Sequence, residues 1–291
     1  MFKRVIYYYQ TFTTLSSILI KNPNVTHIHL SAIHFGIDVD GNPYIHLNDN
    51  PPNDYIFDDV WKELKKAHDL GITIILMIGG AGGAFNSLFS DFYTYYSLLK
   101  EVIIRNKIIK GVDLDIEEFV DIKNVENLIK QIKEDFSDNF IISMAPIQSA
   151  MQNDNPGIGG FIYKELYKSN YGPCIDYFNV QCYYEFSENT YDDIVKNGYP
   201  PNKIVMGMLM NQNFNECSEV IKNLSKKYEY FGGTFIWEYF DAPPGGEKDP
   251  GEWSIKMRSA MSDKCSCFCN NIYLHKIKDA ILKIVKCSCD K

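Results

Sequence analysis

The chain has 291 residues, of which 45% are apolar and 23% charged. This is enough to bury either one barrel-sized core or the cores of two small domains. The net charge of −8 argues against a nucleic-acid partner, because phosphate backbones attract basic surfaces. The first residues lack the pattern of a signal peptide, and no apolar run is long enough to cross a membrane. We expect a monomer without membrane contact that is cytoplasmic or exported without a recognisable signal peptide.

Short apolar segments rich in Ile, Val, Tyr and Phe recur along the chain. Such segments are typical of buried parallel strands, which run to about seven residues. The predicted strands, in chain order, are Lys3–Tyr9, Thr26–Phe35, Thr73–Gly79, Gly111–Glu117, Phe140–Pro146, Tyr177–Tyr184, Ile204–Met210 and Gly233–Tyr239.

Segments with helical periodicity separate these strands. They are Asp54–Leu70, Phe85–Asn106, Val125–Phe136, Gly160–Ser169, Tyr191–Asn197 and Asn215–Tyr228. Eight strands alternating with helices favour a parallel sheet, and at this length a single (β/α)8 TIM barrel is the leading architecture. The alternative is an open doubly wound sheet, but no G-x-G-x-x-G motif follows the first strand.

The C-terminal end differs from the rest of the chain in its cysteines. Five of the eight cysteines lie there, at Cys265, Cys267, Cys269, Cys287 and Cys289. We assign residues 1–262 to the barrel and residues 263–291 to a Cys-rich helical extension packed on it. The C-x-C spacing matches no zinc motif, so free thiols or a disulfide within the tail are favoured over a metal site. We expect neither a metal nor a cofactor.

Three carboxylates share one face of a predicted strand. Side chains alternate along Gly111–Glu117, so Asp113, Asp115 and Glu117 lie on one side and apolar residues on the other. In a barrel the acidic side faces the lumen and leads to the C-terminal end of the strand, where barrel enzymes have their active sites. Burying these charges is costly unless they are used. A protonated carboxyl beside an ionised one is what glycosidic bond cleavage needs.

Two other interpretations of this segment are an edge strand with its acids in water and a magnesium site. The apolar pairs Ile103-Ile104 and Ile108-Ile109 nearby argue against an edge strand. Metal-binding barrels usually draw carboxylates from several strands, whereas here one strand supplies all three. The glycines of Gly79–Gly83 lack the Lys-Ser/Thr of a phosphate-binding loop, so we interpret them as room for a ligand or as a tight turn.

The acidic segment also resembles the signature of an enzyme family. Lys110–Glu117 is similar to the D-G-x-D-x-D-x-E motif of family 18 glycoside hydrolases, the chitinases and related endo-β-N-acetylglucosaminidases. Lys110 stands where the motif has its first Asp, and Ile116 stands where many members have Trp. The segment is the fourth predicted strand, as it is in that family.

Other strand ends resemble the family in the same order. Leu76–Gly80 is similar to S-x-G-G, with Met in place of Ser, and Met144–Pro146 is similar to M-A-P. Gln181–Tyr184 is similar to Q-x-Y-N, with Tyr in place of Asn, and Trp237 ends the eighth strand. Ile6–Gln10 resembles the opening of hevamine-like members. The resemblance implies substrate contacts from Tyr7, Gly79, Gly80, Met144, Gln181 and Trp237.

The resemblance implies a retaining, substrate-assisted mechanism, in which the nucleophile is the N-acetyl oxygen of the substrate. It implies that Glu117 protonates the leaving oxygen and then activates water. Asp115 would bond to the acetamido N–H, and Asp113 would share a proton with Asp115. The Tyr183 hydroxyl would hold the acetamido oxygen in line for attack, and Trp237 would stack on the distorted sugar ring.

The implied partner is an N-acetylglucosamine-containing oligo- or polysaccharide. Chitin is the first candidate, and N-glycans and a non-catalytic lectin function are the alternatives. The stretch from Met210 to Gly232 has room for only one helix, so we expect a barrel without an inserted α+β domain and with a shallow, open cleft. The histidines around the second strand show no metal-ligand spacing, and we interpret them as structural, with His34 or Phe35 as the candidates to border the cleft.

Overall fold

The computed structural model describes residues 3–21 and 24–262. Within them, nine strands form one sheet in the order β1-β9-β8-β7-β6-β5-β4-β2-β3, and β1 also pairs with β2. The strands are β1 Arg4–Tyr9, β2 His27–Ile37, β3 Pro43–Leu47, β4 Thr73–Gly79, β5 Ile109–Asp115, β6 Ile141–Met144, β7 Tyr177–Gln181, β8 Ile204–Leu209 and β9 Gly233–Trp237. All except β3 pair in parallel, and the β1–β2 pairing closes them into a barrel.

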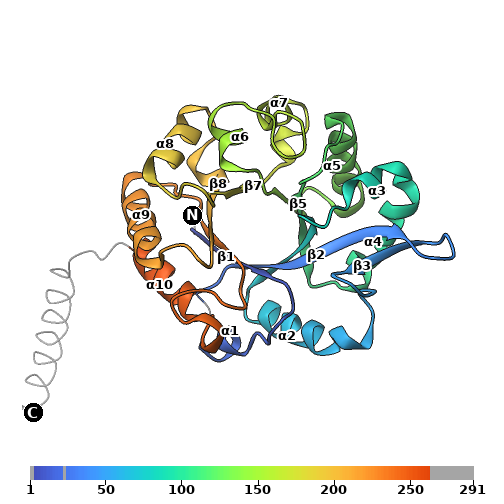
Figure 1. Cartoon of the computed structure of the whole chain (residues 1–291), viewed down its shortest axis with the longest axis horizontal. Coiled ribbons are helices and arrows are strands. Elements are labelled where there is room, and N and C mark those ends of the chain that lie inside the picture. The colour runs from blue at the N-terminus through green and yellow to red at the C-terminus, as the bar shows by residue number, and fades with distance from the viewer. Residues whose placement is uncertain (1–2, 22–23, 263–291) are drawn as a thin grey trace, which may run out of the picture. The chain divides into compact units, whose positions relative to one another are not determined.

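Helices surround this barrel, as Figure 1 shows. They are α1 Ser16–Lys21, α2 Asp58–Asp69, α3 Phe85–Ser90, α4 Phe92–Arg105, α5 Ile122–Phe136, α6 Gln148–Gln152, α7 Tyr163–Lys168, α8 Glu188–Lys196, α9 Phe214–Lys227 and α10 Glu252–Met261. The predicted single (β/α)8 TIM barrel is therefore confirmed. In the described residues, the connection from β8 to β9 holds α9 and no inserted domain.

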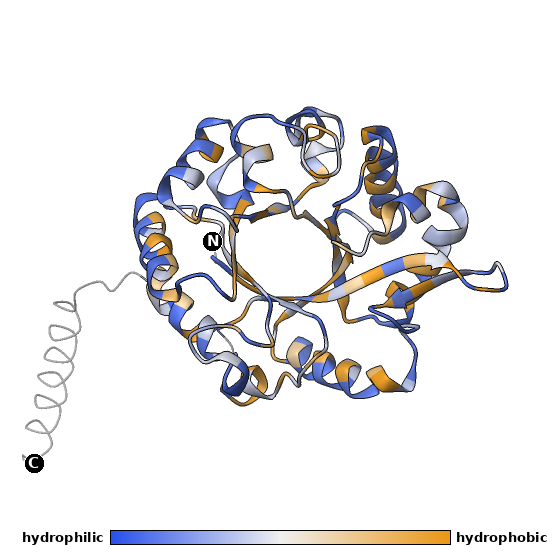
Figure 2. Ribbon diagram, viewed as in Figure 1, coloured by the Kyte–Doolittle hydropathy of each residue, from blue (hydrophilic) through white to orange (hydrophobic). Residues whose placement is uncertain are grey.

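The core has two layers, because side chains on a strand alternate between faces. The outer layer lies between the strands and the helices and includes Val112 and Leu114 of β5. The inner layer fills the lumen with residues from several strands: Ile6, Tyr8, Ala32, Met77, Tyr177, Val205 and Phe235. Figure 2 shows hydrophobic residues concentrated on the barrel strands and hydrophilic ones on the outer helices.

Two elements differ from the prediction. The predicted helix Phe85–Asn106 is two helices, because the side chain of Asp91 caps α4 by accepting the Thr94 N–H at 3.3 Å. The second predicted strand continues to Ile37 and turns into β3 as an antiparallel hairpin. Its turn has Gly41 at φ +84°, where a residue without Cβ is favoured.

The tail prediction lies outside the described residues. The boundary at residue 262, the helical extension over 263–291 and its five cysteines therefore stay predictions. In the described part of the chain, Cys174, Cys182 and Cys217 are free thiols. No helix among the described residues is long and apolar enough to span a membrane.

Candidate active site

The three carboxylates lie where the alternation of β5 predicts. Asp113 and Asp115 both face the lumen and are buried, with 0% and 4% of their surface exposed. Glu117 comes two residues after the end of β5 and is half-buried. The set thus leads from the closed interior of the barrel to the C-terminal mouth, where the strands β4, β7 and β9 also end.

Asp113 is surrounded by hydrogen-bond donors from other strands. The Tyr8 hydroxyl of β1 donates to Oδ2 at 2.6 Å, and the Ser143 hydroxyl of β6 donates to Oδ1 at 2.6 Å. The Asn179 amide of β7 adds a bond to Oδ1 at 3.0 Å. Both oxygens are therefore satisfied without solvent, as a buried carboxylate requires.

His29 of β2 completes this arrangement. Its side chain is fully buried, with Nδ1 at 3.4 Å from Asp113 Oδ2 and Nε2 at 3.2 Å from the Tyr177 hydroxyl. Burial by itself would raise the pKa of Asp113, but attraction by His29 and the bonds from Ser143 and Tyr8 outweigh it, and the pKa is lowered. Asp113 is thus the carboxyl that stays ionised.

Asp115 has the opposite surroundings. Burial, and then the nearby charges of Glu117 and Asp113, hold its pKa well above the ordinary value, and the bond from Gln181 offsets this only in part. Two aspartates two residues apart on one strand therefore have pKa values shifted in opposite directions. The expectation that like charges separate the pKa values of this cluster agrees with this pattern.

Gln181, the last residue of β7, joins the two upper carboxylates. Its Nε2 lies 3.1 Å from Asp115 Oδ1, 3.0 Å from Glu117 Oε1 and 3.0 Å from the Ala145 carbonyl. An amide nitrogen carries two hydrogens, so these three acceptors share them. One amide thereby holds both carboxyl groups on the same side of the mouth.

Two aromatic residues stand beside these groups. Tyr183 is half-buried, with its ring 6.4 Å from that of Phe235. Burial, then the charges of Asp115 and Glu117, raise the pKa of its hydroxyl, which places Tyr183 in the same electrostatic environment. The Trp237 ring is 5.5 Å from Tyr8 and packs on the lumen cluster.

Gly79 and Gly80 form a tight strand-end turn against Asp115. Their φ angles are +92° and +81°, and the Gly80 N–H donates to the Asp115 carbonyl at 2.8 Å. A Cβ at Gly79 would lie 2.4 Å from that carbonyl, and one at Gly80 would lie 3.4 Å from Asp115 Oδ2. The absence of side chains here lets β4 approach the carboxylate closely.

A hollow of about 600 Å³ opens at the ends of β1, β2 and β3. It is lined by Gln10, Phe12, His34, Tyr44, His46, Asn48, Asp49 and Gly82. The rings of Tyr44 and His46 stack on each other with centroids 4.1 Å apart and line the hollow side by side. Of the two candidates to border the cleft, His34 lines this hollow, whereas Phe35 is buried in the outer layer.

The described residues contain no group of three or more His, Cys, Asp or Glu side chains arranged to hold a metal ion.

The model of the glycosyl hydrolases family 18 matches residues 3–253. The chain belongs to this family.

Several members of known structure or sequence resemble the chain. A fungal family 18 endo-β-N-acetylglucosaminidase shares 30% identity at a TM-score of 0.81, over 91% of this chain and 100% of that one. The chitinase ChiC from Aspergillus fumigatus shares 30% identity at a TM-score of 0.77, over 90% and 100%. Chitinase 2 from Rhizopus oligosporus is 26% identical over 209 residues, which are 62% of this chain and 36% of that protein.

The prediction that Tyr7 contacts the substrate, made from a family 18 motif, is wrong. Tyr7 faces the outer layer, not the lumen: its hydroxyl donates to the Pro250 carbonyl at 2.6 Å and accepts the Ser254 N–H at 3.0 Å. Its ring packs against Tyr239 and Trp253. The lumen residue is its neighbour Tyr8, because adjacent residues on a strand point to opposite faces.

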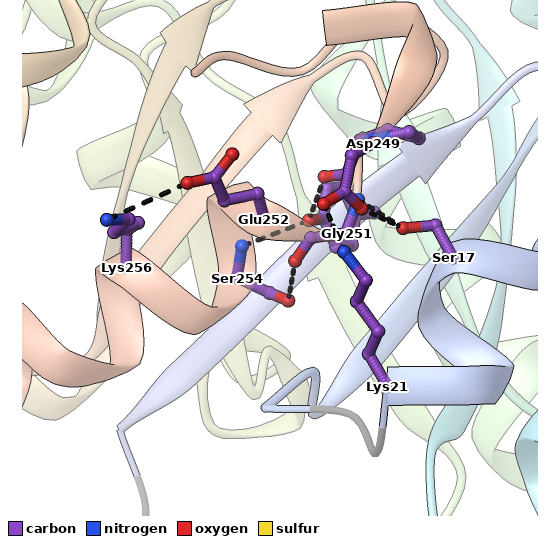
Figure 3. A network of polar contacts seen from close by, with 9 residues as sticks. Ser17, Lys21, Asp249, Gly251, Glu252, Ser254 and Lys256 are labelled. Carbon is purple, nitrogen blue, oxygen red and sulfur yellow. Dashed lines mark hydrogen bonds and ion pairs between the residues drawn. The ribbon is translucent and has the colours of Figure 1, made fainter. Parts of the chain in front are cut away.

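The anchorage on that outer side involves the start of α10, which Figure 3 shows. Asp249 pairs with Lys21 and accepts from the Ser17 hydroxyl at 2.5 Å. The Ser17 hydroxyl in turn accepts the Gly251 N–H at 3.0 Å, and Ser254 donates to the Gly251 carbonyl at 2.9 Å. This network joins α1 to α10 behind β1, so the surroundings of Tyr7 are structural.

The prediction that Met144 contacts the substrate is also wrong. Met144 is fully buried and belongs to the outer layer, while its neighbour Ser143 points inward to Asp113. The alternation of β6 again decides the outcome. Site residues that the motifs did not indicate are Tyr8, His29, Ser143 and Asn179, together with the lining of the hollow.

Proposed function

We propose that the chain hydrolyses β-1,4 bonds of N-acetylglucosamine glycans with retention of configuration. One observation carries this proposal: Glu117 and Asp115 sit at the mouth of the barrel, joined by the amide of Gln181. One of these carboxyls is half-buried and within reach of a ligand, and the other is buried and favours its protonated form. Such a pair suits acid–base cleavage of a glycosidic bond.

In the proposed mechanism, the acetamido oxygen of the substrate attacks its own anomeric carbon, as in substrate-assisted glycosidases. Glu117 protonates the leaving oxygen and then takes a proton from the water that opens the oxazolinium intermediate. Asp115 binds the acetamido N–H, and its ionised form stabilises the positive charge that develops. Asp115 and Glu117 share one proton: the surroundings favour it on Asp115 in the free site, and in the complex Glu117 donates this proton to the leaving oxygen. Asp115 is then ionised when the cation forms beside it.

The neighbouring groups support this step. Asp113, with its lowered pKa, stays ionised and repels a second negative charge on Asp115. We propose that the Tyr183 hydroxyl, protonated because of its raised pKa, orients the acetamido oxygen. Trp237 supplies an aromatic face for the sugar ring at the end of β9.

For the substrate, chitin-type oligomers are our first candidate and the N-glycan core is the second. The N-glycan core is supported as a candidate by the likeness to a family 18 endo-β-N-acetylglucosaminidase along the whole of that chain. It also agrees with the single helix α9 between β8 and β9, which builds no extra wall over the mouth. The hollow at the β1–β3 ends gives either glycan a place to extend.

Mass spectrometry of the products from chitotetraose and from a high-mannose glycan tests the proposal. We expect oligomer products from at least one substrate. Glu117→Gln should lower kcat by about 10²–10⁴-fold, the usual contribution of a positioned acid, and leave the Kd for chitotetraose nearly unchanged. If the parent protein binds chitotetraose but releases no product from either glycan, the chain is a lectin and the hydrolase proposal is wrong.

A further inference from the structure

A buried carboxylate with no part in this mechanism follows directly after Trp237. Glu238 is 7% exposed. Its Oε2 accepts the Gln10 N–H at 3.1 Å, and its Oε1 accepts the Phe240 N–H at 3.1 Å. Each carboxylate oxygen thus holds one backbone segment: the chain after β1 on one side and the chain after β9 on the other.

The bond to Gln10 lies just beyond the paired parts of β1 and β9. The ladder between these strands ends at Tyr7 and Ile236, and the Tyr239 N–H then donates to the Tyr8 carbonyl at 2.9 Å. Beyond this bond, the next N–H of the chain after β1, that of Gln10, is bonded to the side chain of Glu238 and not to a backbone carbonyl. The Glu238 side chain therefore continues the β1–β9 connection to the rim of the barrel.

Gln10 is in turn hydrogen-bonded to Asn48, another residue that lines the hollow. Its carbonyl accepts from Asn48 Nδ2 at 3.0 Å, and Asn48 Oδ1 accepts the Ala32 N–H at 3.0 Å. Gln10 and Asn48 both line the hollow. A chain of hydrogen bonds thus runs from Glu238, beside the site aromatic Trp237, to the wall of the hollow.

We propose that Glu238 is a positioning residue that fixes the Gln10 wall of the sugar-binding hollow when ionised and releases it when protonated. The binding of sugar in this hollow rests on the function proposed above. An ionised carboxylate accepts at both oxygens, whereas a carboxylic acid turns one of them into a donor. Protonation therefore weakens one of the two oxygens as an acceptor, and with it the bond to the Gln10 or the Phe240 N–H.

The surroundings put this change in the neutral range. Burial raises the pKa of Glu238 to about 7, with a smaller upward contribution from Asp241, against the lowering by the N–H groups that it binds. On β1, Tyr9 is the titratable neighbour, and its own raised pKa keeps it neutral. The charge of Glu63 on α2 contributes to raising the pKa of Tyr9 and that of Tyr239. The wall is thus held above the pKa of Glu238 and loosened below it.

Calorimetric binding of chitotetraose to the Glu117→Gln protein, at pH 6 and pH 8, tests this proposal without turnover. We expect Kd to be about two- to tenfold higher at pH 6, the effect of one lost hydrogen bond. Adding Glu238→Gln, which has one acceptor oxygen like the protonated acid, should give the weaker Kd at both pH values. Adding Asp241→Asn instead should move the midpoint to lower pH, because one charge that raises the pKa of Glu238 is gone.

Tryptophan fluorescence of the ligand-free protein gives a second readout, since Trp237 adjoins Glu238. We expect a step near the pKa of Glu238 that the Glu238→Gln variant lacks, and this result supports the proposal even if chitotetraose binds at neither pH. Failure of chitotetraose to bind at either pH would contradict chitin-type oligomers as the substrate in the proposed function. A fluorescence step or a Kd ratio that persists unchanged in Glu238→Gln would overturn the role of Glu238.

Discussion

Asp113 and Asp115 lie two residues apart on the same face of β5, yet their surroundings are opposite. Asp113 receives three hydrogen bonds from β1, β6 and β7 and lies beside His29. Asp115 shares a single side-chain amide with Glu117. Both are buried, so depth does not separate them. The difference shows that neighbouring charges and hydrogen-bond donors together decide which carboxyl has the lower pKa: His29 and three donors surround Asp113, whereas Glu117 and Asp113 surround Asp115.

This contrast also separates stability from function. At the level of Asp113 the burial of charge is compensated, as in an ordinary structural network. At the level of Asp115 it is not, and a buried carboxyl with few donors is the kind of group that active sites maintain.

The largest effect is expected for Asp113→Asn. The amide presents a donor where Tyr8 now donates, and the charge that attracts His29 is lost. We expect the free energy of unfolding at neutral pH to fall by roughly 3–5 kcal/mol, as when one partner of a buried pair is removed. Denaturant unfolding measures this.

The pH dependence of this loss has a definite sign. The pKa of Asp113 is lowered in the folded state, so its stabilising contribution is present above the unfolded value of about 3.9 and is lost as pH falls through the folded value. The deficit of Asp113→Asn should therefore shrink in acid. A deficit of the same size at low and neutral pH would mean that the charge of Asp113 is not the cause.

Tyr8→Phe should have an intermediate effect. It removes one hydrogen bond to a charged group, which is worth about 1.5–3 kcal/mol, and it should raise the pKa of Asp113. Both the melting temperature and kcat should fall. Tyr7→Phe is the matched control, since it is the same change one residue earlier on the outer face: the melting temperature should fall while kcat stays near that of the parent. Equal losses of kcat in the two variants would contradict the assigned faces of β1.

The smallest effect, and the opposite sign, is expected for Asp115→Asn. Its folded-state pKa is raised, so its contribution to stability is full below about pH 3.9 and is lost as pH rises through the folded pKa. Removing the charge should add about 0.5–2 kcal/mol at pH 8 and nothing near pH 3, while turnover falls. Unfolding at both pH values checks this. A variant less stable than the parent at pH 8 would show that Asp115 is compensated after all.

Much of this arrangement could be predicted from the chain alone. The acidic segment alternates Asp and Glu with Val, Leu and Ile, so its inward face was unambiguous and its position on the barrel followed. Tyr7–Tyr9 has the same residue three times, so the pattern did not show which tyrosine points inward, and the prediction chose the wrong one. The prediction of Met144 is wrong for a different reason: the motif identifies the end of a strand but does not indicate which residue faces the lumen.

The partners of Asp113 could not be predicted. Tyr8, His29, Ser143 and Asn179 come from four different strands and meet only because the barrel closes. The hairpin β2–β3 did have a local signal: Asp40-Gly41 is a common turn pair between apolar strands. Reading that signal would have indicated β3, and with it the stacked Tyr44 and His46 of the hollow.

The bonds around Asp113 also bear on how the chain folds. The bond from Tyr8 spans 105 residues and the bond from Asn179 spans 66. A fragment that ends before β6 would contain the Asp113 carboxylate without two of its donors, Ser143 and Asn179. Since a buried charge without partners is unfavourable, partly assembled barrels gain little from closing around it. The burial of Asp113 on β5 thus requires strands that come both earlier and later in the chain. We therefore expect the barrel to unfold as one cooperative unit.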